Sequence, residues 1–278
     1  MVKSKFFDNS QYFILDKELI TSYGNKVNIY KLTNELLEED ILNKWATSLR
    51  NNYIEEELLP DLISGTGLTQ QEYLKKNILP DFENRQGAGT MSGEFGEILI
   101  YDYINFNLKY YITRTRYLEK VNPNMPISGS DVIGYKMVNS DIPCSSDELI
   151  VAEVKTRSSM IGKKVNLCQE TLEAAIKDSS KDRVRLAESL NAEKRRLLSR
   201  FKKSEAKIVE RFQNKTDYPF ILNFFAVAVL DTELCIEESI LEVIEAQYEI
   251  IGTTNVLIIH SKELKSFLRD LYRRACEC

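Results

Sequence analysis

Apolar and polar residues alternate in two short segments near the N-terminus, "QYFIL" and "KVNIYKL". This period of two predicts β-strands. The segment "TNELLEEDILNKWATSLRNNYI" instead has apolar residues three to four positions apart, which predicts an amphipathic helix. A turn-rich stretch, "LLPDLISGTG", follows it. We therefore expect residues 1–90 to form an N-terminal α+β region that contacts a partner or DNA.

A more regular α/β pattern begins near residue 90, after Gly87 and Gly89. Thr90 or Ser92 can cap a helix whose apolar residues recur at helical spacing until about Asn107. Segments rich in β-formers follow, and they predict three strands at residues 109–117, 131–138 and 148–156. The long apolar run of the third strand is typical of a central strand that is covered on both faces.

The rest of the chain continues this α/β pattern. After Val165 a long segment without Pro or Gly predicts one broken helix or two. A buried strand, a helix, a strand and a final helix follow, at residues 218–231, 236–248, 255–260 and 262–275. Residues 91–230 thus have the predicted order αβββαβ. We expect an α/β fold with a central mixed sheet, in which residues 91–278 form one domain beside the N-terminal region.

Charged residues end the central strand "IVAEVKTR". Glu153 and Lys155 flank Val154, so their side chains lie on the same face of the strand. If this strand pairs with the preceding one through a turn centred near Ile142, Asp131 lies opposite Glu153. Two carboxylates and an amine are then expected at one point of the sheet.

Two close carboxylates repel each other and remain ionised in a partly buried site only beside a cation. Mg²⁺ fits this site because it prefers oxygen ligands and keeps several waters. Asp131, Glu153 and the Val154 carbonyl are the predicted ligands, and Lys155 can neutralise charge that develops on a phosphate. The expected chemistry is phosphodiester hydrolysis with Mg²⁺ or Mn²⁺. A structural salt bridge is the alternative interpretation of the same residues.

The helix that precedes the strands carries two further acids, Glu94 and Glu97, which share a face because they are three residues apart. Glu97 is a candidate fourth catalytic residue, and Glu94 is a weaker candidate. Acidic residues near a helix N-terminus also occur without any function.

Composition limits the possible chemistry. The chain has a single histidine, His260, which excludes nucleases and zinc hydrolases that need several imidazoles. We expect a structural role for it at the end of a strand. Five cysteines, an odd number, favour a reducing compartment over a disulfide framework. No window approaches 18 uncharged apolar residues, so we expect a cytoplasmic protein without a membrane span.

Positive charge is concentrated in one segment of an acidic chain. The net charge is −5, but residues 177–215 hold 13 Lys and Arg against six Asp and Glu, a net charge of +7. Such a segment can bind a phosphate backbone, contact an acidic partner or form a solvated helix face, and the sequence does not separate these. The candidate nucleic-acid-binding residues are Arg157, Lys163, Lys164, Lys202 and Lys203.

"GSD" followed by "EVK" on the next strand, within this order of elements, resembles the PD-(D/E)xK superfamily of restriction-endonuclease-like nucleases. Ser130 stands where the motif has proline. More narrowly, "GTMSGEFGEILIYDYI", "SGSDVIGYK" and "DELIVAEVKTR" resemble HamA, the nuclease family of the Hachiman anti-phage defence systems.

The resemblance implies a metal-dependent DNA endonuclease that works beside a helicase partner, HamB. By motif position it assigns catalysis to Asp131, Glu153 and Lys155, with Glu97 as an accessory acid. Two other functions remain open: a non-catalytic module of the same fold that binds nucleic acid or the helicase, and a structural adaptor in which the strand charges form a salt bridge.

Overall fold

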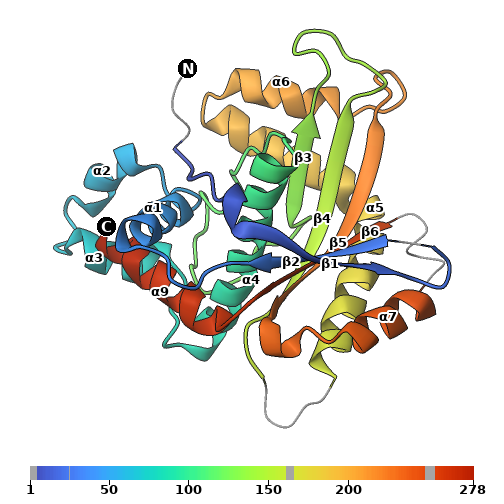
Figure 1. The fold of residues 1–278 in the computed structure, drawn as a ribbon. Helices are drawn as coiled ribbons and strands as arrows, with labels where there is room; N and C mark the ends of the chain where they lie inside the picture. The colour runs from blue at the N-terminus through green and yellow to red at the C-terminus, as the bar shows by residue number, and fades with distance from the viewer. Residues whose placement is uncertain (1–4, 25, 161–165, 248–253) are drawn as a thin grey trace.

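A six-stranded mixed β-sheet forms the centre of the molecule (Figure 1). The structure is a computed structural model that describes residues 5–24, 26–160, 166–247 and 254–278. The strands are β1 (Phe13–Ile20), β2 (Lys26–Leu32), β3 (Val132–Lys136), β4 (Glu148–Arg157), β5 (Ile221–Asp231) and β6 (Thr254–Ser261). The helices are α1 (Glu39–Arg50), α2 (Leu59–Ile63), α3 (Gln70–Tyr73), α4 (Arg85–Asp102), α5 (Leu167–Ser199), α6 (Lys203–Arg211), α7 (Glu237–Ala246) and α9 (Leu264–Glu277).

The strand order across the sheet is β1-β2-β6-β5-β4-β3. The central strands β2, β6, β5 and β4 are parallel, whereas β1 and β3 are antiparallel to their neighbours and form the two edges. The N-terminal hairpin therefore belongs to the same sheet as β3–β6. The expected domain boundary near residue 90 falls within α4, and strands from both sides of it share the sheet. The predicted fold class, α/β with a central mixed sheet, is confirmed.

Helices cover both faces of the sheet (Figure 1). α4 packs on one face, against β4, whose Ile150, Ala152 and Val154 share a hydrophobic core with residues of α1, α4 and α9, and α1 packs on α9. α5 and α6 pack on the other face, against Leu149 and Val151. Successive β4 residues therefore enter two different cores, which explains the continuous apolar run of this strand.

α4 begins earlier than the sequence predicted. Its N-cap is Asn84, whose side chain accepts a hydrogen bond from the Gln86 amide over 2.9 Å, instead of Thr90 or Ser92. Thr90 donates instead to the Asn124 carbonyl over 2.8 Å. The helix continues into a π-helical turn (Tyr103–Asn107), so the predicted end near Asn107 is confirmed.

The predicted strand at residues 109–117 is wrong. Only Tyr111 forms an isolated bridge, to Tyr135 of β3. Lys109 and Arg114 have positive φ angles of 63° and 50°, which interrupt the extended backbone. Arg114 and Arg116 are both buried beside acidic partners, whereas the alternation and the β-forming residues of this segment had predicted a strand. The first strand of the predicted αβββαβ order is therefore reduced to one bridge.

The long helical segment forms two helices, α5 and α6, separated at Phe201, whose φ is 58°. The predicted strands and helices from residue 218 onwards correspond to β5, α7, β6 and α9. All five cysteines are free. His260 is buried between Asp16 and Thr232, at 3.2 Å and 3.0 Å, which confirms its structural role.

Candidate active site

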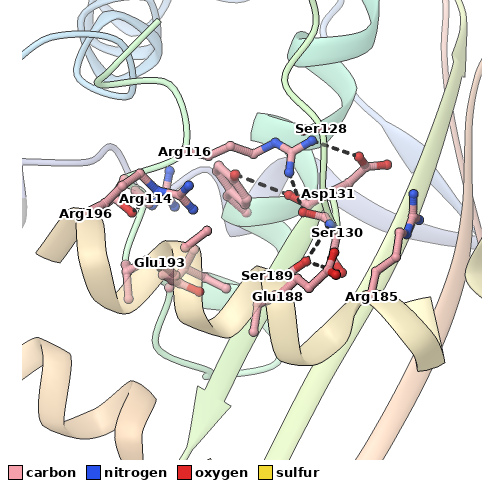
Figure 2. Close-up of a pocket in the computed structure, with 17 residues that line it drawn as sticks. Arg114, Arg116, Ser128, Ser130, Asp131, Arg185, Glu188, Ser189, Glu193 and Arg196 are labelled. Carbon is pink, nitrogen blue, oxygen red and sulfur yellow. Dashed lines mark hydrogen bonds and ion pairs between the residues drawn. The ribbon is translucent and has the colours of Figure 1, made fainter. Parts of the chain in front are cut away.

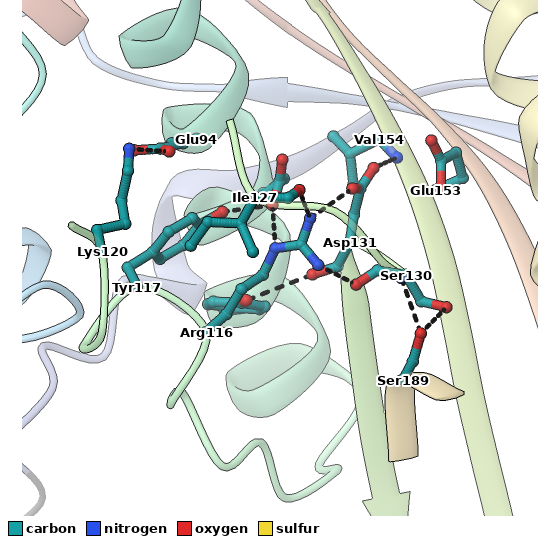
Figure 3. Close-up of polar contacts among 12 residues, drawn as sticks. Glu94, Arg116, Tyr117, Lys120, Ile127, Ser130, Asp131, Glu153, Val154 and Ser189 are labelled. Carbon is teal, nitrogen blue, oxygen red and sulfur yellow. Dashed lines mark hydrogen bonds and ion pairs between the residues drawn. The ribbon is translucent and has the colours of Figure 1, made fainter. Parts of the chain in front are cut away.

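The start of β3 lies beside the charged end of β4. Val132 pairs with Ala152, so the preceding residue, Asp131, lies at the position opposite Glu153, as the turn symmetry predicted. Oδ2 of Asp131 accepts a hydrogen bond from the Val154 amide over 3.0 Å (Figure 3). The main chain of β4 thereby holds Asp131 between the two charged residues of "EVK".

Glu153 and Lys155 lie on the face of β4 that α5 covers. The Glu153 side chain is 5% exposed, and its Oε1 accepts a hydrogen bond from Lys155 Nζ over 2.8 Å. Two residues of α5 complete the cluster. Arg185 Nη2 lies 3.2 Å from Glu153 Oε2, and Asp178 Oδ2 lies 2.9 Å from Lys155 Nζ. The predicted same-face pair is therefore confirmed, within a four-residue network.

This network keeps Lys155 positively charged. Burial alone would lower the pKa of the ammonium, but the Glu153 and Asp178 carboxylates outweigh burial and raise that pKa above its ordinary value. A lysine with a raised pKa is a poor general base at neutral pH. Its charge suits it to stabilising a negative group instead.

Arg116 joins the other two carboxylates. Its side chain is 9% exposed, and its guanidinium lies 3.2 Å from Asp131 Oδ1 and 3.1 Å from Glu97 Oε2. It also donates to the carbonyls of Ser130 and Ile127, the latter over 2.8 Å. Arg116 therefore fixes the loop before β3 to α4 (Figure 3).

Burial raises the pKa of Asp131 to about 7, and the nearby Glu97 carboxylate adds to this effect, while Arg116 opposes it. Burial also raises the pKa of Glu97, again against the effect of Arg116. Glu153 further raises the pKa of Glu97. Glu97 thus interacts electrostatically with Glu153 and with Asp131, and an additional cation near these carboxylates would favour their ionised forms.

Glu94 has a different environment from Glu97. It pairs with Lys120 and accepts a hydrogen bond from the Tyr53 hydroxyl over 2.9 Å. Tyr53 in turn lies 2.6 Å from the Tyr272 hydroxyl of α9. This buried network joins α4 to the segment after α1 and to α9, so Glu94 has a structural role.

Three charged residues of the site were missed from the sequence: Arg116, Asp178 and Arg185. Arg116 lies in the segment that was wrongly predicted as a strand. Asp178 and Arg185 are seven residues apart, or about two helical turns, so their spacing indicates a shared helix face. Nothing in the local sequence indicates which strand that face meets.

The candidate nucleic-acid-binding residues that the structure describes lie on two elements, at the end of β4 and at the junction of α5 and α6. Arg157 ends β4 and is partly exposed, and Lys203 is exposed at the start of α6. Lys202 lies 3.3 Å from Glu55. Lys163 and Lys164 lie outside the described residues. Other basic residues of the 177–215 segment also pair within the chain, including Lys194, Arg200 and Arg211. These ion pairs reduce the positive charge that the composition suggested.

The oxygen atoms near Asp131 and Glu153 determine which metal ion the site could hold. Within the described ranges, no three His, Cys, Asp or Glu side chains are grouped so that they could hold a metal. Asp131 and Glu153 supply carboxylate oxygens, and their contacts among the described residues are with nitrogen atoms of Arg116, Val154, Lys155 and Arg185. Such a small oxygen set suits Mg²⁺, which is usually held by one or two carboxylates and keeps several waters.

Comparisons with known proteins support a family assignment. In the part of the chain that the structure describes, no helix combines the length and the apolar character needed to cross a membrane. No curated protein and no solved structure matches the chain. The family model HamA matches residues 8–275 of the 278 residues. The chain therefore belongs to the HamA family, which implies a role in Hachiman anti-phage defence.

Proposed function

We propose that this chain is a metal-dependent DNA endonuclease that acts with a HamB-like helicase subunit in anti-phage defence. The observation that carries the proposal is the position of Asp131, bonded to the Val154 amide and opposite Glu153. It brings an acid from one strand to the "EVK" segment of the next. The family match supports the defence context.

Asp131, Glu153 and the Val154 carbonyl would hold Mg²⁺ or Mn²⁺. When bound there, the ion would polarise the scissile phosphate and favour formation of hydroxide from water. Arg116 and Arg185 keep the two carboxylates oriented through contacts at 3.2 Å. Binding of an ion would require the carboxylates to exchange part of these ion pairs for contacts with the metal.

Lys155 would stabilise the negative charge that builds on the phosphate during hydrolysis. Its ammonium bonds both Glu153 and Asp178, which fixes its direction along the face of β4. Asp178 is thus a positioning residue for Lys155. Glu97 would act as an accessory acid through its shared contact with Arg116.

A second function follows from the same ion pairs. Each candidate carboxylate already has a basic partner: Glu97 and Asp131 have Arg116, and Glu153 has Lys155 and Arg185. A chain in which these contacts are permanent would be a non-catalytic adaptor that binds nucleic acid or the helicase. Cutting that depends on a divalent ion distinguishes the two functions.

The test is cleavage of plasmid DNA by the purified chain, alone and with the helicase subunit, in Mg²⁺, Mn²⁺ or chelator. We expect cutting with either metal and none with chelator. Lys155→Ala should abolish cutting while the melting temperature and helicase binding are retained. Lys136→Ala is the matched control, because this lysine of β3 pairs at 3.4 Å with Glu148, away from the site. Intact helicase binding without cutting under any metal condition would support the adaptor.

A further inference from the structure

A cavity of about 290 Å³ lies beside Asp131, between α5, residues 112–116 and the loop 128–131 (Figure 2). We call it the α5 pocket. Tyr101 of α4 and the side chains of Ile112 and Ile133 contribute its apolar wall. The remaining lining is rich in serine, arginine and glutamate. A polar recess of this size near a candidate catalytic acid suggests a place for part of a ligand.

One face of α5 lines the pocket and links it to the candidate active site. Arg185, Ser189 and Arg196 recur at helical spacing and all border the cavity (Figure 2). Arg185 also contacts Glu153, while Arg196 is eleven residues further along, or roughly 16 Å at the rise of an α-helix. The pocket therefore extends away from the site along α5.

The loop at the opposite wall is fastened to α5. The Ser130 amide donates to Ser189 Oγ over 3.0 Å, and the two hydroxyls lie 3.1 Å apart. Gly129 has a φ of +107°, a conformation that disfavours other residues. A Cβ at Gly129 would lie 3.4 Å from Ser189 Oγ. These hydrogen bonds and the backbone conformation of Gly129 fix the path of the loop along α5 and thereby define one wall of the pocket.

Arg196 is the residue of the pocket that is available to donate hydrogen bonds to a phosphate. Its Nε donates to Thr115 Oγ1 over 3.3 Å, which orients the guanidinium. Among the described residues, its two terminal amino groups have no hydrogen-bond acceptor. A guanidinium held at one nitrogen and free at the other two is suited to bidentate binding of a phosphate.

In the part of the chain that the structure describes, no acidic residue of the pocket forms an ion pair with Arg196. Glu193 is buried and already accepts hydrogen bonds from Thr113 and from the Tyr135 hydroxyl, the latter over 2.7 Å. Burial raises the pKa of Glu193, which reduces its tendency to carry charge. Asp131 is paired with Arg116. Glu188 remains, but it is exposed at the rim, where water weakens its effect.

We propose that the α5 pocket binds a phosphate group of the DNA strand that the candidate active site would cut, with Arg196 as the principal ligand. The identity of the strand as substrate rests on the proposed nuclease function. Phosphate binding itself does not require hydrolysis. The cavity is too small for a duplex, so one nucleotide of the strand enters it.

The experiment measures binding of a fluorescent single-stranded oligonucleotide to the full chain by anisotropy, in chelator so that no cutting occurs. Arg196→Ala should weaken binding by about tenfold or more and reduce the salt slope by about one phosphate contact. Arg195→Ala is the matched control, since it removes the same charge from the neighbouring exposed residue, which does not line the pocket. It should have a much smaller effect.

A second variant, Ala192→Leu, fills the pocket without changing charge and should also weaken binding. Melting temperatures show whether either variant affects folding. If Arg195→Ala and Arg196→Ala weaken oligonucleotide binding equally, the proposal is overturned, because the effect is then general electrostatic attraction. If neither Arg196→Ala nor Ala192→Leu weakens binding, the proposal is also overturned. A deoxynucleoside monophosphate that displaces the oligonucleotide at equal concentration, through Arg196, would assign the pocket to free nucleotides instead of a strand.

Failure of the phosphate-pocket proposal can be distinguished from failure of the proposed nuclease function. Metal-dependent cutting together with unchanged oligonucleotide binding by Arg196→Ala would leave the nuclease intact and remove the pocket assignment. Arg196-dependent binding without cutting under any metal condition would retain the pocket as the phosphate site of an adaptor.

Discussion

The amide of Val154 donates a hydrogen bond to the Asp131 carboxylate over 3.0 Å. This bond joins the acid before β3 to the strand that carries Glu153 and Lys155. Because the donor is a main-chain group of a paired strand, the position of Asp131 depends on the sheet and not on a flexible side chain. The geometry of the candidate site is therefore sensitive to changes in the loop that precedes β3.

Ser130→Pro tests that loop. Proline occupies this position in the superfamily motif, but here the Ser130 amide donates to Ser189 Oγ over 3.0 Å, and proline has no amide hydrogen. We expect a loss of about 1 kcal/mol in the free energy of unfolding, measured by urea denaturation. Ser130→Ala keeps the amide and should be milder. An equal loss in both variants would mean that the hydroxyl, and not the amide, fastens the loop.

Gly96→Ala tests the packing of α4 on β4. A Cβ at Gly96 would lie 1.9 Å from Thr156 Oγ1, so the substitution should lower the free energy of unfolding by about 1–3 kcal/mol. Adding Thr156→Ala should restore much of this loss, because the next contacts are at 3.3 Å and 3.4 Å. Gly93→Ala is the control: nothing lies within 4 Å, so it should be neutral or stabilising. Additive effects of Gly96→Ala and Thr156→Ala would contradict the contact.

Asp102→Ala tests the buried pair that holds the segment after α4. Asp102 and Arg114 side chains are each 2% exposed and lie 2.7 Å apart. Removing the acid leaves a buried guanidinium without its ionic partner, which should lower the free energy of unfolding by about 3–5 kcal/mol. Asp40→Ala, which breaks an exposed pair with Lys44, should change it by less than about 1 kcal/mol. Similar losses in the two variants would contradict the structural importance of the Asp102–Arg114 pair.

Glu193→Gln tests how burial of this carboxyl group changes the pH dependence of the free energy of unfolding. Burial raises the pKa of Glu193 in the folded state, so the folded protein binds the proton more tightly than the unfolded chain does. The resulting penalty is absent below the unfolded pKa of about 4.3 and grows as pH rises towards the folded value. We expect Glu193→Gln to raise the free energy of unfolding at pH 8 relative to its effect at pH 4.

The exposed Glu188→Gln, on the same helix, serves as the control for that measurement. It should show no comparable difference between the two pH values. A Glu193→Gln effect that is the same at pH 4 and pH 8 would mean that the carboxyl does not titrate differently on folding.

Local sequence patterns were sufficient for β3, β4 and their register. Alternation and β-branched residues indicate the two strands, and the symmetry of the turn between them places Asp131 opposite Glu153. The same reasoning failed at residues 109–117, which have equally strong β-formers. There, Arg114 and Arg116 bind acids of α4, and these tertiary contacts override the local preference.

The remaining features depend on contacts between distant residues. β2 joins β6, more than 200 residues later, and no local pattern distinguishes a hairpin that enters the main sheet from one in a separate region. Asp178 and Arg185 lie in a long charged helix whose other charges mostly face solvent or each other. Their proximity to Lys155 and Glu153 arises from the crossing of α5 over β4, which the sequence does not encode locally.

The most direct test of the central claim is Mn²⁺ binding to the full chain, measured by isothermal titration calorimetry. If Asp131 and Glu153 share one divalent ion, Asp131→Asn and Glu153→Gln should each remove the same high-affinity site, while Glu148→Gln at the start of β4 leaves it unchanged. Melting curves confirm that each variant is folded. Wild-type Mn²⁺ binding by folded Asp131→Asn and Glu153→Gln variants would contradict the account.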